Sequence, residues 1–244
     1  MTQIHIAEDR SSWVQMSAQF IVEAAQRALQ DSGRFTIALS GGSTPRPVYQ
    51  ALPELWEQHG LEWQTVHLLW SDERCVPLDH PQSNYRMARQ ALIDLVDIPH
   101  ANVHPMRCGD DPTASASDYE GVLRELYPRQ DWPTLDLLLL GMGPDGHTAS
   151  LFPGTRALSE HSRWVVANEV PQLDKMRLTL TFPAINAARK IAFLIAGNEK
   201  ADMVHQILGD GNGETPVPAQ GVHPEEGELH WLLDPEAASR LVEI

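Results

Sequence analysis

The sequence predicts an α/β protein with a mostly parallel, doubly wound sheet that carries helices on both faces. Short apolar runs of strand length alternate along the chain with capped or amphipathic helical segments, and this alternation favours parallel strands joined by helices. The chain has 244 residues, of which 42% are hydrophobic, enough to bury a sizeable core. With no evident internal repeat, we expect one domain spanning residues 1–244.

The N-terminal half begins with a helix whose start Ser11 or Ser12 can cap and which ends near Gly33. The apolar run "FTIAL" at 35–39 follows and reads as a buried strand. Further elements are expected in this order: a helix from Pro45 to about Gln58, a strand at 66–70, a polar loop at 71–82, a helix capped by Ser83 or Asn84, a short strand near Val103, and a helix from about Thr113 to Tyr127.

The C-terminal half adds four strand-like runs, and helical segments are expected after the last two. These runs are "LDLLLL" at 135–140, "RLTLTF" at 177–182, "IAFLIA" at 191–196 and "LHWLL" at 229–233. The segment 209–228 is rich in Gly, Pro and acidic residues, which is typical of a surface loop.

Charge and composition limit the classes of partner. A formal net charge of -15 argues against nucleic acid and against anionic membrane surfaces, which need clustered cations. The first residues show no basic region followed by an apolar core, and no apolar run of about 18 residues occurs. Cys75 and Cys108 make neither a zinc-ligand set nor a disulfide framework, which favours a reducing cytosol. We therefore expect a cytoplasmic protein without membrane or nucleic-acid partners.

Three predicted strands end in loops of unusual composition, at 40–46, 71–75 and 141–154. Ligands of parallel α/β sheets bind beyond the carboxyl ends of the strands, so these loops predict a common site.

The loop "SGGSTPRP" combines two glycines with two hydroxyls before a proline-started helix. Gly41 and Gly42 let the backbone approach an anion, and Ser43 and Thr44 can donate hydroxyl groups to it. No Gly-Lys-Ser/Thr follows, so the loop is not a Walker A sequence. A tight turn with Ser43 or Thr44 as the helix cap is the alternative reading.

The charged stretch "SDER" follows the predicted strand at 66–70. Asp72, Glu73 and Arg74 can place a carboxylate and a guanidinium in one cleft, which suits a hydroxylated, anionic ligand. A solvated charged turn is the alternative.

The glycines in "GMGPDG", 141–146, fit the spacing of a dinucleotide fingerprint, and Glu169 could supply its acidic residue. That fingerprint needs a full helix after the third glycine, however, and Pro153 and Gly154 end any helix there within about two turns. The pattern therefore favours a different use for this loop.

The same loop presents Asp145 and His147 at a strand exit. An unperturbed histidine has a pKa near 6.5 and accepts a proton at neutral pH, so His147 is a candidate general base. A structural, hydrogen-bonded histidine is the alternative.

Lys200 falls in the first turn of a predicted helix, where a cation opposes the helix dipole unless it binds an anion. A solvated surface lysine is the alternative.

Together these segments resemble the 6-phosphogluconolactonase family. The resemblance rests on the blocks "ALSGGSTPRPVYQAL", "WSDERCVPLDHPQSNY", "GMGPDGHTASLFPG", "RLTLTFPAINAARKIAFLIAGNEKA" and "GELHWLLD", which run in the family's order from residue 38 to 234. It implies a Rossmann-like fold of the sugar-phosphate isomerase/deaminase type and hydrolysis of 6-phosphoglucono-1,5-lactone in the pentose phosphate pathway. It implies no metal and no organic cofactor.

The resemblance also implies roles for particular residues. His147 corresponds to the family's general base, and Arg74 and Lys200 correspond to ligands of the anionic substrate. The other two catalytic candidates are Asp145, beside His147 in sequence, and Arg74, as a donor to the negative charge that grows on the carbonyl oxygen. The stretch Gly41–Thr44 corresponds to the sugar-phosphate loop. Because distant charges are screened beyond roughly 8 Å at physiological salt, substrate capture by an acidic chain must depend on local cations. Further substrate-binding candidates are Arg46, Arg177 and, for a hydroxyl or as a brace for Arg74, Asp72.

Two rival functions remain. A glucosamine-6-phosphate deaminase would carry an Asn-Glu-Pro pattern after the histidine, where this chain has "SLFPG" with Phe152 in place of the acid. Phenylalanine cannot transfer a proton. A non-catalytic sugar-phosphate sensor would lack the base, whereas His147 is present. The expected partner is a phosphorylated sugar lactone, and the expected assembly is a monomer or small homo-oligomer.

Overall fold

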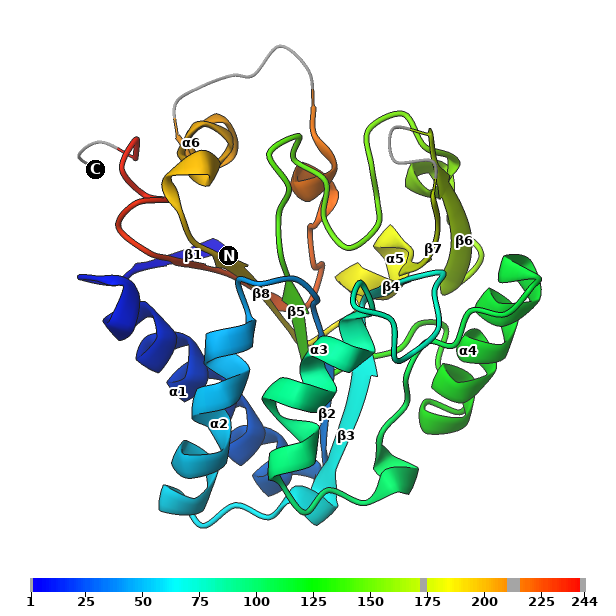
Figure 1. The fold of residues 1–244 in the computed structure, drawn as a ribbon, viewed down its shortest axis with the longest axis horizontal. Coiled ribbons are helices and arrows are strands. Elements are labelled where there is room, and N and C mark those ends of the chain that lie inside the picture. Colours follow the sequence, from blue (N-terminus) through cyan, green and yellow to red (C-terminus); the bar gives the residue numbers. More distant parts are fainter. Residues whose placement is uncertain (1, 172–174, 210–215, 242–244) are drawn as a thin grey trace.

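A computed structural model describes residues 2–171, 175–209 and 216–241. Its main sheet has six strands, all parallel, in the order β1-β9-β8-β5-β2-β3 (Figure 1). This confirms the predicted α/β class with a mostly parallel sheet. The strands are β1 (Thr2–Ile6), β2 (Phe35–Leu39), β3 (Val66–Trp70), β5 (Leu137–Leu140), β8 (Lys190–Ile195) and β9 (Glu228–Leu233).

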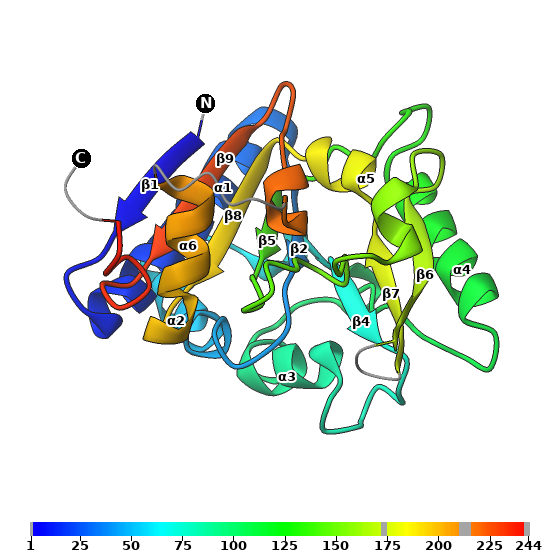
Figure 2. The same ribbon diagram turned by 90° about the horizontal axis from the view of Figure 1, so that it is seen from above.

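Six α-helices accompany the sheets in the described part of the chain. They are α1 (Arg10–Ser32), α2 (Arg46–Gln58), α3 (Asn84–Ala91), α4 (Pro112–Leu126), α5 (Phe182–Asn186) and α6 (Ala201–Leu208). Seen from above, α6 lies beside β8 and β9, and α4 and α5 lie at the opposite end of the molecule (Figure 2). The indole of Trp13 in α1 is fully buried and donates to the carbonyl oxygen of Leu232, which fixes α1 against β9.

A second, antiparallel sheet has the order β4-β7-β6. Its strands are β4 (Asp72–Arg74), β6 (Val165–Val170) and β7 (Lys175–Leu180). The prediction of an uninterrupted loop at 71–82 was therefore wrong at its start. The three charged residues of β4 show no strand pattern in the sequence. The strand forms because β7 supplies its backbone hydrogen-bond partners.

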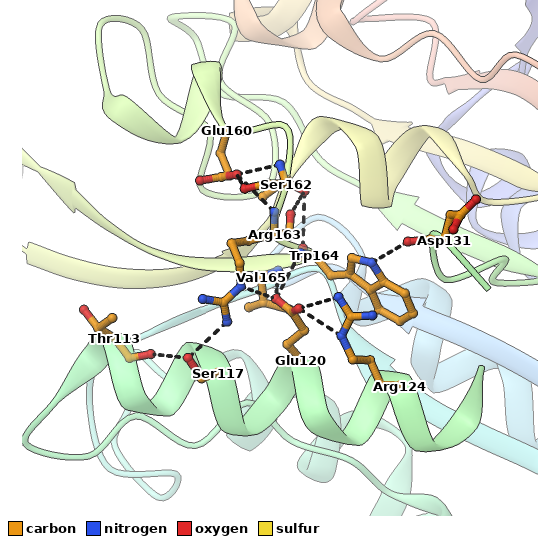
Figure 3. Close-up of polar contacts among 11 residues, drawn as sticks. Thr113, Ser117, Glu120, Arg124, Asp131, Glu160, Ser162, Arg163, Trp164 and Val165 are labelled. Carbon is orange, nitrogen blue, oxygen red and sulfur yellow. Dashed lines mark hydrogen bonds and ion pairs between the residues drawn. The ribbon is translucent and has the colours of Figure 1, made fainter. Parts of the chain in front are cut away.

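The small sheet is attached to α4 through the buried carboxylate of Glu120 (Figure 3). Glu120 accepts hydrogen bonds from Arg124 Nε at 3.0 Å, from Arg163 Nε at 2.9 Å and from the backbone N–H of Trp164 at 3.0 Å. Burial opposes the charge, but these donors outweigh it and keep the pKa of Glu120 below its usual value. A charged anchor thus fixes α4 to β6, the strand that pairs with β7.

Several predicted elements match, and a few differ. The predicted strands at 35–39, 66–70, 135–140, 191–196 and 229–233 and the helices near 45–58 and 113–127 are confirmed within a few residues. The side chain of Asp9, rather than Ser11 or Ser12, caps α1. Val103 makes only a single bridge to Leu68, and the chain after β9 forms turns instead of a helix. The edge strand β1 was not predicted, and residues 210–215 of the predicted loop lie outside the described residues.

The expectation that the two cysteines form no disulfide was wrong. Cys75 and Cys108 are joined by a disulfide bond, with their Cα atoms 4.9 Å apart and a sequence separation of 33. The bridge from Val103 to Leu68 and the hydrogen bond from the N–H of His104 to the Leu68 carbonyl bring this segment alongside β3. Cys108 therefore reaches the end of β4, a proximity that sequence spacing does not reveal.

Among the described helices, none is long and apolar enough to cross a membrane.

Candidate active site

A cavity of about 260 Å³ lies where four parallel strands end. The segments that follow β2, β3, β5 and β8 all contribute to its wall, together with β7 and the first residue of α3. The predicted site residues that line it are Gly41, Gly42, Ser43, Thr44, Asp72, Arg74, His147, Arg177 and Lys200. The structure thus brings nearly all of them to one place.

Arg46 is the exception among the predicted cations. It begins α2, its side chain is exposed, and it is not part of the cavity wall. Lys200 stands at the N-cap position of α6 and does line the cavity, as a cation serving an anion there would.

The glycine loop after β2 has the backbone form that only glycine adopts easily. Gly42 has a φ of 95°, in the left-handed region. The N-cap of α2 is Pro45, and no side chain caps the helix. The alternative in which Ser43 or Thr44 caps α2 is therefore wrong, and the first N–H groups of α2 are left without a side-chain partner at the edge of the cavity.

His147 and Asp145 form a hydrogen-bonded pair on the loop after β5. The imidazole Nδ1 lies 2.5 Å from Asp145 Oδ1, and the same oxygen accepts from the backbone N–H of His147 at 3.2 Å. A carboxylate at Nδ1 favours the tautomer with the proton on that nitrogen, which leaves Nε2 as the proton acceptor. Gly143 is required here, because a Cβ at that position would overlap the imidazole and the carboxylate. The glycine spacing therefore makes room for a His–Asp pair.

Phe152 contacts both His147 and Arg177. Its ring stacks on the imidazole with centroids 3.9 Å apart and planes 20° apart. The guanidinium carbon of Arg177 lies over the same phenyl ring, 5.6 Å from its centroid. The stacking contact holds the imidazole in one plane.

Arg74 and Arg177 are direct register partners in the β4–β7 ladder. Both Nε atoms are buried and find no hydrogen-bond partner in the described ranges of the chain. Burial, and then the charge of Arg74, lowers the pKa of the Arg177 guanidinium, while Asp72 and Glu73 oppose that shift. Two adjacent guanidiniums with unused donors form a strong site for an anion.

The acidic residues of "SDER", Asp72 and Glu73, hold neighbouring segments of the site in place through hydrogen bonds. Glu73 is fully buried and accepts from the backbone N–H groups of Asn84 at 2.7 Å and Tyr85 at 2.8 Å, which caps α3. Burial raises the pKa of Glu73, and these donors oppose the rise. Asp72 accepts from Ser150 Oγ at 2.6 Å. Sequence reasoning missed both Asn84 and Ser150, which look like ordinary cap and loop residues.

The strand exits of this parallel α/β sheet gather a glycine loop, paired guanidiniums, a lysine and a His–Asp pair. This fold and this set of groups define a protein that binds a small anionic metabolite. A family model described as "Glucosamine-6-phosphate isomerases/6-phosphogluconolactonase" matches residues 8–231. The chain belongs to this family.

Individual relatives agree with the family match. The chain is 41% identical over 243 residues to a 6-phosphogluconolactonase of Synechocystis sp., covering 98% of each chain. It is 39% identical over 247 residues to that of Mycobacterium tuberculosis, again covering 98% of each. The solved 6-phosphogluconolactonase from Trypanosoma cruzi superposes with a TM-score of 0.88 at 31% identity, over 100% of this chain and 98% of that one.

Proposed function

We propose that this protein is a 6-phosphogluconolactonase that hydrolyses 6-phosphoglucono-1,5-lactone to 6-phosphogluconate, with His147 as the general base. The observation that carries the mechanism is the pairing of Asp145 with Nδ1 of His147, which lines a cavity together with two arginines and a lysine. The near full-length relatives that bear this name support the activity. This reaction belongs to the oxidative pentose phosphate pathway.

His147 activates the water. Nε2 takes a proton from a water molecule as its oxygen attacks the lactone carbonyl carbon, and the resulting imidazolium is stabilised by the Asp145 carboxylate. The tetrahedral intermediate then breaks its bond to the ring oxygen. The imidazolium returns the proton to that oxygen, which leaves as the C5 hydroxyl, so His147 ends the cycle neutral.

The cations serve the two negative centres of the reaction. Arg74, Arg177 and Lys200 divide the phosphate and the developing oxyanion between them, and the N–H groups of the glycine loop add donors. Two buried Nε groups without partners are donors that a bound anion would satisfy. Every step uses side chains and water, so the mechanism calls for neither a metal nor an organic cofactor.

Phe152 separates this proposal from the deaminase alternative. Ring opening of an amino sugar needs a second acid–base group after the histidine, and the residue that stacks on His147 is a phenylalanine. The sensor alternative has no use for a His–Asp pair. As parts of the same proposal, residues 1–244 work as one catalytic domain, as a monomer or small homo-oligomer without nucleic-acid partners. The expectation of a cytoplasmic protein loses its cysteine argument, because Cys75 and Cys108 form a disulfide.

A lactonase assay on freshly made substrate tests the function. We expect turnover well above the spontaneous hydrolysis of the lactone, unchanged by exhaustive chelation with EDTA or by added nicotinamide nucleotide. Equilibrium binding of the product 6-phosphogluconate without any acceleration of hydrolysis would instead support the sensor. Loss of activity with EDTA that zinc restores would contradict the mechanism.

A further inference from the structure

Asn84, the first residue of α3, places its carboxamide in the wall of the cavity. The residue is only 1% exposed. Its Nδ2 donates to the backbone carbonyl of Asp72 at 2.9 Å and to Asp72 Oδ1 at 3.2 Å. Because two acceptors hold the amide nitrogen, the orientation of the carboxamide is determined by its network, and the other atom of the group is the acceptor Oδ1.

Oδ1 of Asn84 is buried and has no hydrogen-bond partner among the residues that the structure describes. It lies against the glycine loop, since a Cβ added to Gly41 would fall directly on the carboxamide. A buried acceptor without a donor is unfavourable, and such atoms in native proteins call for an explanation. Asn84 and Gly41 both line the cavity in which the substrate is proposed to bind.

The neighbouring carboxylate holds this corner together. Asp72 accepts from Ser150 Oγ through one oxygen and from Asn84 Nδ2 through the other. It is a brace for Asn84 and Ser150. Both of its oxygens already accept a hydrogen bond, whereas Asn84 Oδ1 accepts none from the described residues. A neutral amide oxygen also suits a pocket for a phosphorylated sugar, because a free carboxylate beside the phosphate would repel it.

We propose that Asn84 is a specificity-determining residue whose Oδ1 accepts a hydrogen bond from one hydroxyl of the substrate's sugar ring. The proposal rests on the proposed function for the identity of the ligand. Asp72 acts as its positioning residue by holding Nδ2. The contact selects for a hydroxylated ring, because an analogue without that hydroxyl leaves Oδ1 unpaired in the complex.

A substrate-by-variant cycle tests this contact. The lactone and its 2-, 3- and 4-deoxy analogues are compared on the wild-type enzyme and on Asn84→Ala. On the wild-type enzyme, one analogue should show kcat/KM reduced by about 5- to 10-fold, the size of one neutral hydrogen bond. On Asn84→Ala, the full lactone should lose a similar factor, and that one analogue should lose little more.

Ser83→Ala is the matched control. Ser83 is buried at the same helix start and donates to Glu73, so its loss disturbs α3 without removing the acceptor. It should affect all four lactones by the same factor. If Asn84→Ala also affects all four equally, Asn84 has a structural role only, and the proposal is overturned.

Two further measurements keep the outcome decisive. The wild-type comparison among lactones needs no variant, so it stands even if Asn84→Ala fails to fold; equal kcat/KM for all four would refute the contact. Calorimetric binding of 6-phosphogluconate and its deoxy analogues repeats the cycle without turnover. A chain that binds them selectively but hydrolyses no lactone would sink the proposed function and preserve this inference.

Discussion

Arg74 and Arg177 face each other across the β4–β7 ladder, although 102 residues lie between them in sequence. Their mutual repulsion is unfavourable, and within the described part of the chain both Nε groups are buried without hydrogen-bond partners. Asp72 and Glu73 offset part of the charge, but they accept hydrogen bonds from Ser150, Asn84 and Tyr85 and not from these Nε groups. The pair is thus built to receive an anion.

Removing one guanidinium should weaken substrate binding. For Arg177→Met, which keeps an apolar stem against Phe152, we expect KM to rise by roughly 10- to 100-fold, corresponding to a charged hydrogen bond of about 1.5–3 kcal/mol. The exposed Arg46→Ala is the comparison, since it removes the same charge outside the cavity. Steady-state kinetics on both variants decides the matter: an unchanged KM for Arg177→Met would remove it from the site.

His104 should make the fold sensitive to mild acid. Burial, and then the charge of His67 with its Nδ1 3.2 Å from His104 Nε2, lowers the pKa of His104 to about 4. Between pH 6.5 and 4, the unfolded chain takes up a proton that folded His104 does not, so stability falls as the pH falls. Melting temperatures of wild type and His104→Gln from pH 7.5 to 5 check this: the variant should show the flatter profile, and parallel profiles would contradict it.

The disulfide should contribute to stability. A cross-link closing a loop of this length typically stabilises a protein by about 2–4 kcal/mol through the unfolded state. Denaturant unfolding with and without reductant, and of the double variant Cys75→Ser, Cys108→Ser, should show that loss. Free-thiol titration of the purified protein before reduction is the direct check, and two reactive thiols with no stability change on reduction would count against the bond.

The sequence predicted β2, β3, β5, β8 and β9 of the main sheet because they are largely apolar runs, such as Leu137–Leu140, which is buried throughout. It did not predict the edge strand β1, which is mostly exposed. It could not place β4, since Asp72–Arg74 has no strand pattern and pairs only because β7 lies beside it. The loop at 141–154 was recognisable as a candidate site from local residues, but the sequence could not show that Asp145 contacts His147, which the structure does. Asn84 was missed because its role depends on Gly41 and Asp72, which are distant in sequence.

The pairing of Arg177 with Arg74 also could not be predicted from the sequence. A lone arginine at a strand start carries little information, and only the antiparallel register with β4 pairs it with Arg74. Conversely, Arg46 looked well placed beside the glycine loop, but the turn into α2 directs it to solvent. Contacts across sheets, and the direction of a side chain at a helix start, depend on tertiary packing.

The most direct test of the central claim measures kcat and melting temperature on one sample of His147→Asn. Asparagine keeps a polar group next to Asp145 but cannot accept the proton from water, so kcat should fall by about 10²- to 10⁴-fold with the melting temperature nearly unchanged. 6-Phosphogluconate should still bind through the cations and the glycine loop. A well-folded His147→Asn enzyme that retains more than about a tenth of the wild-type kcat would contradict the assignment of His147 as the general base.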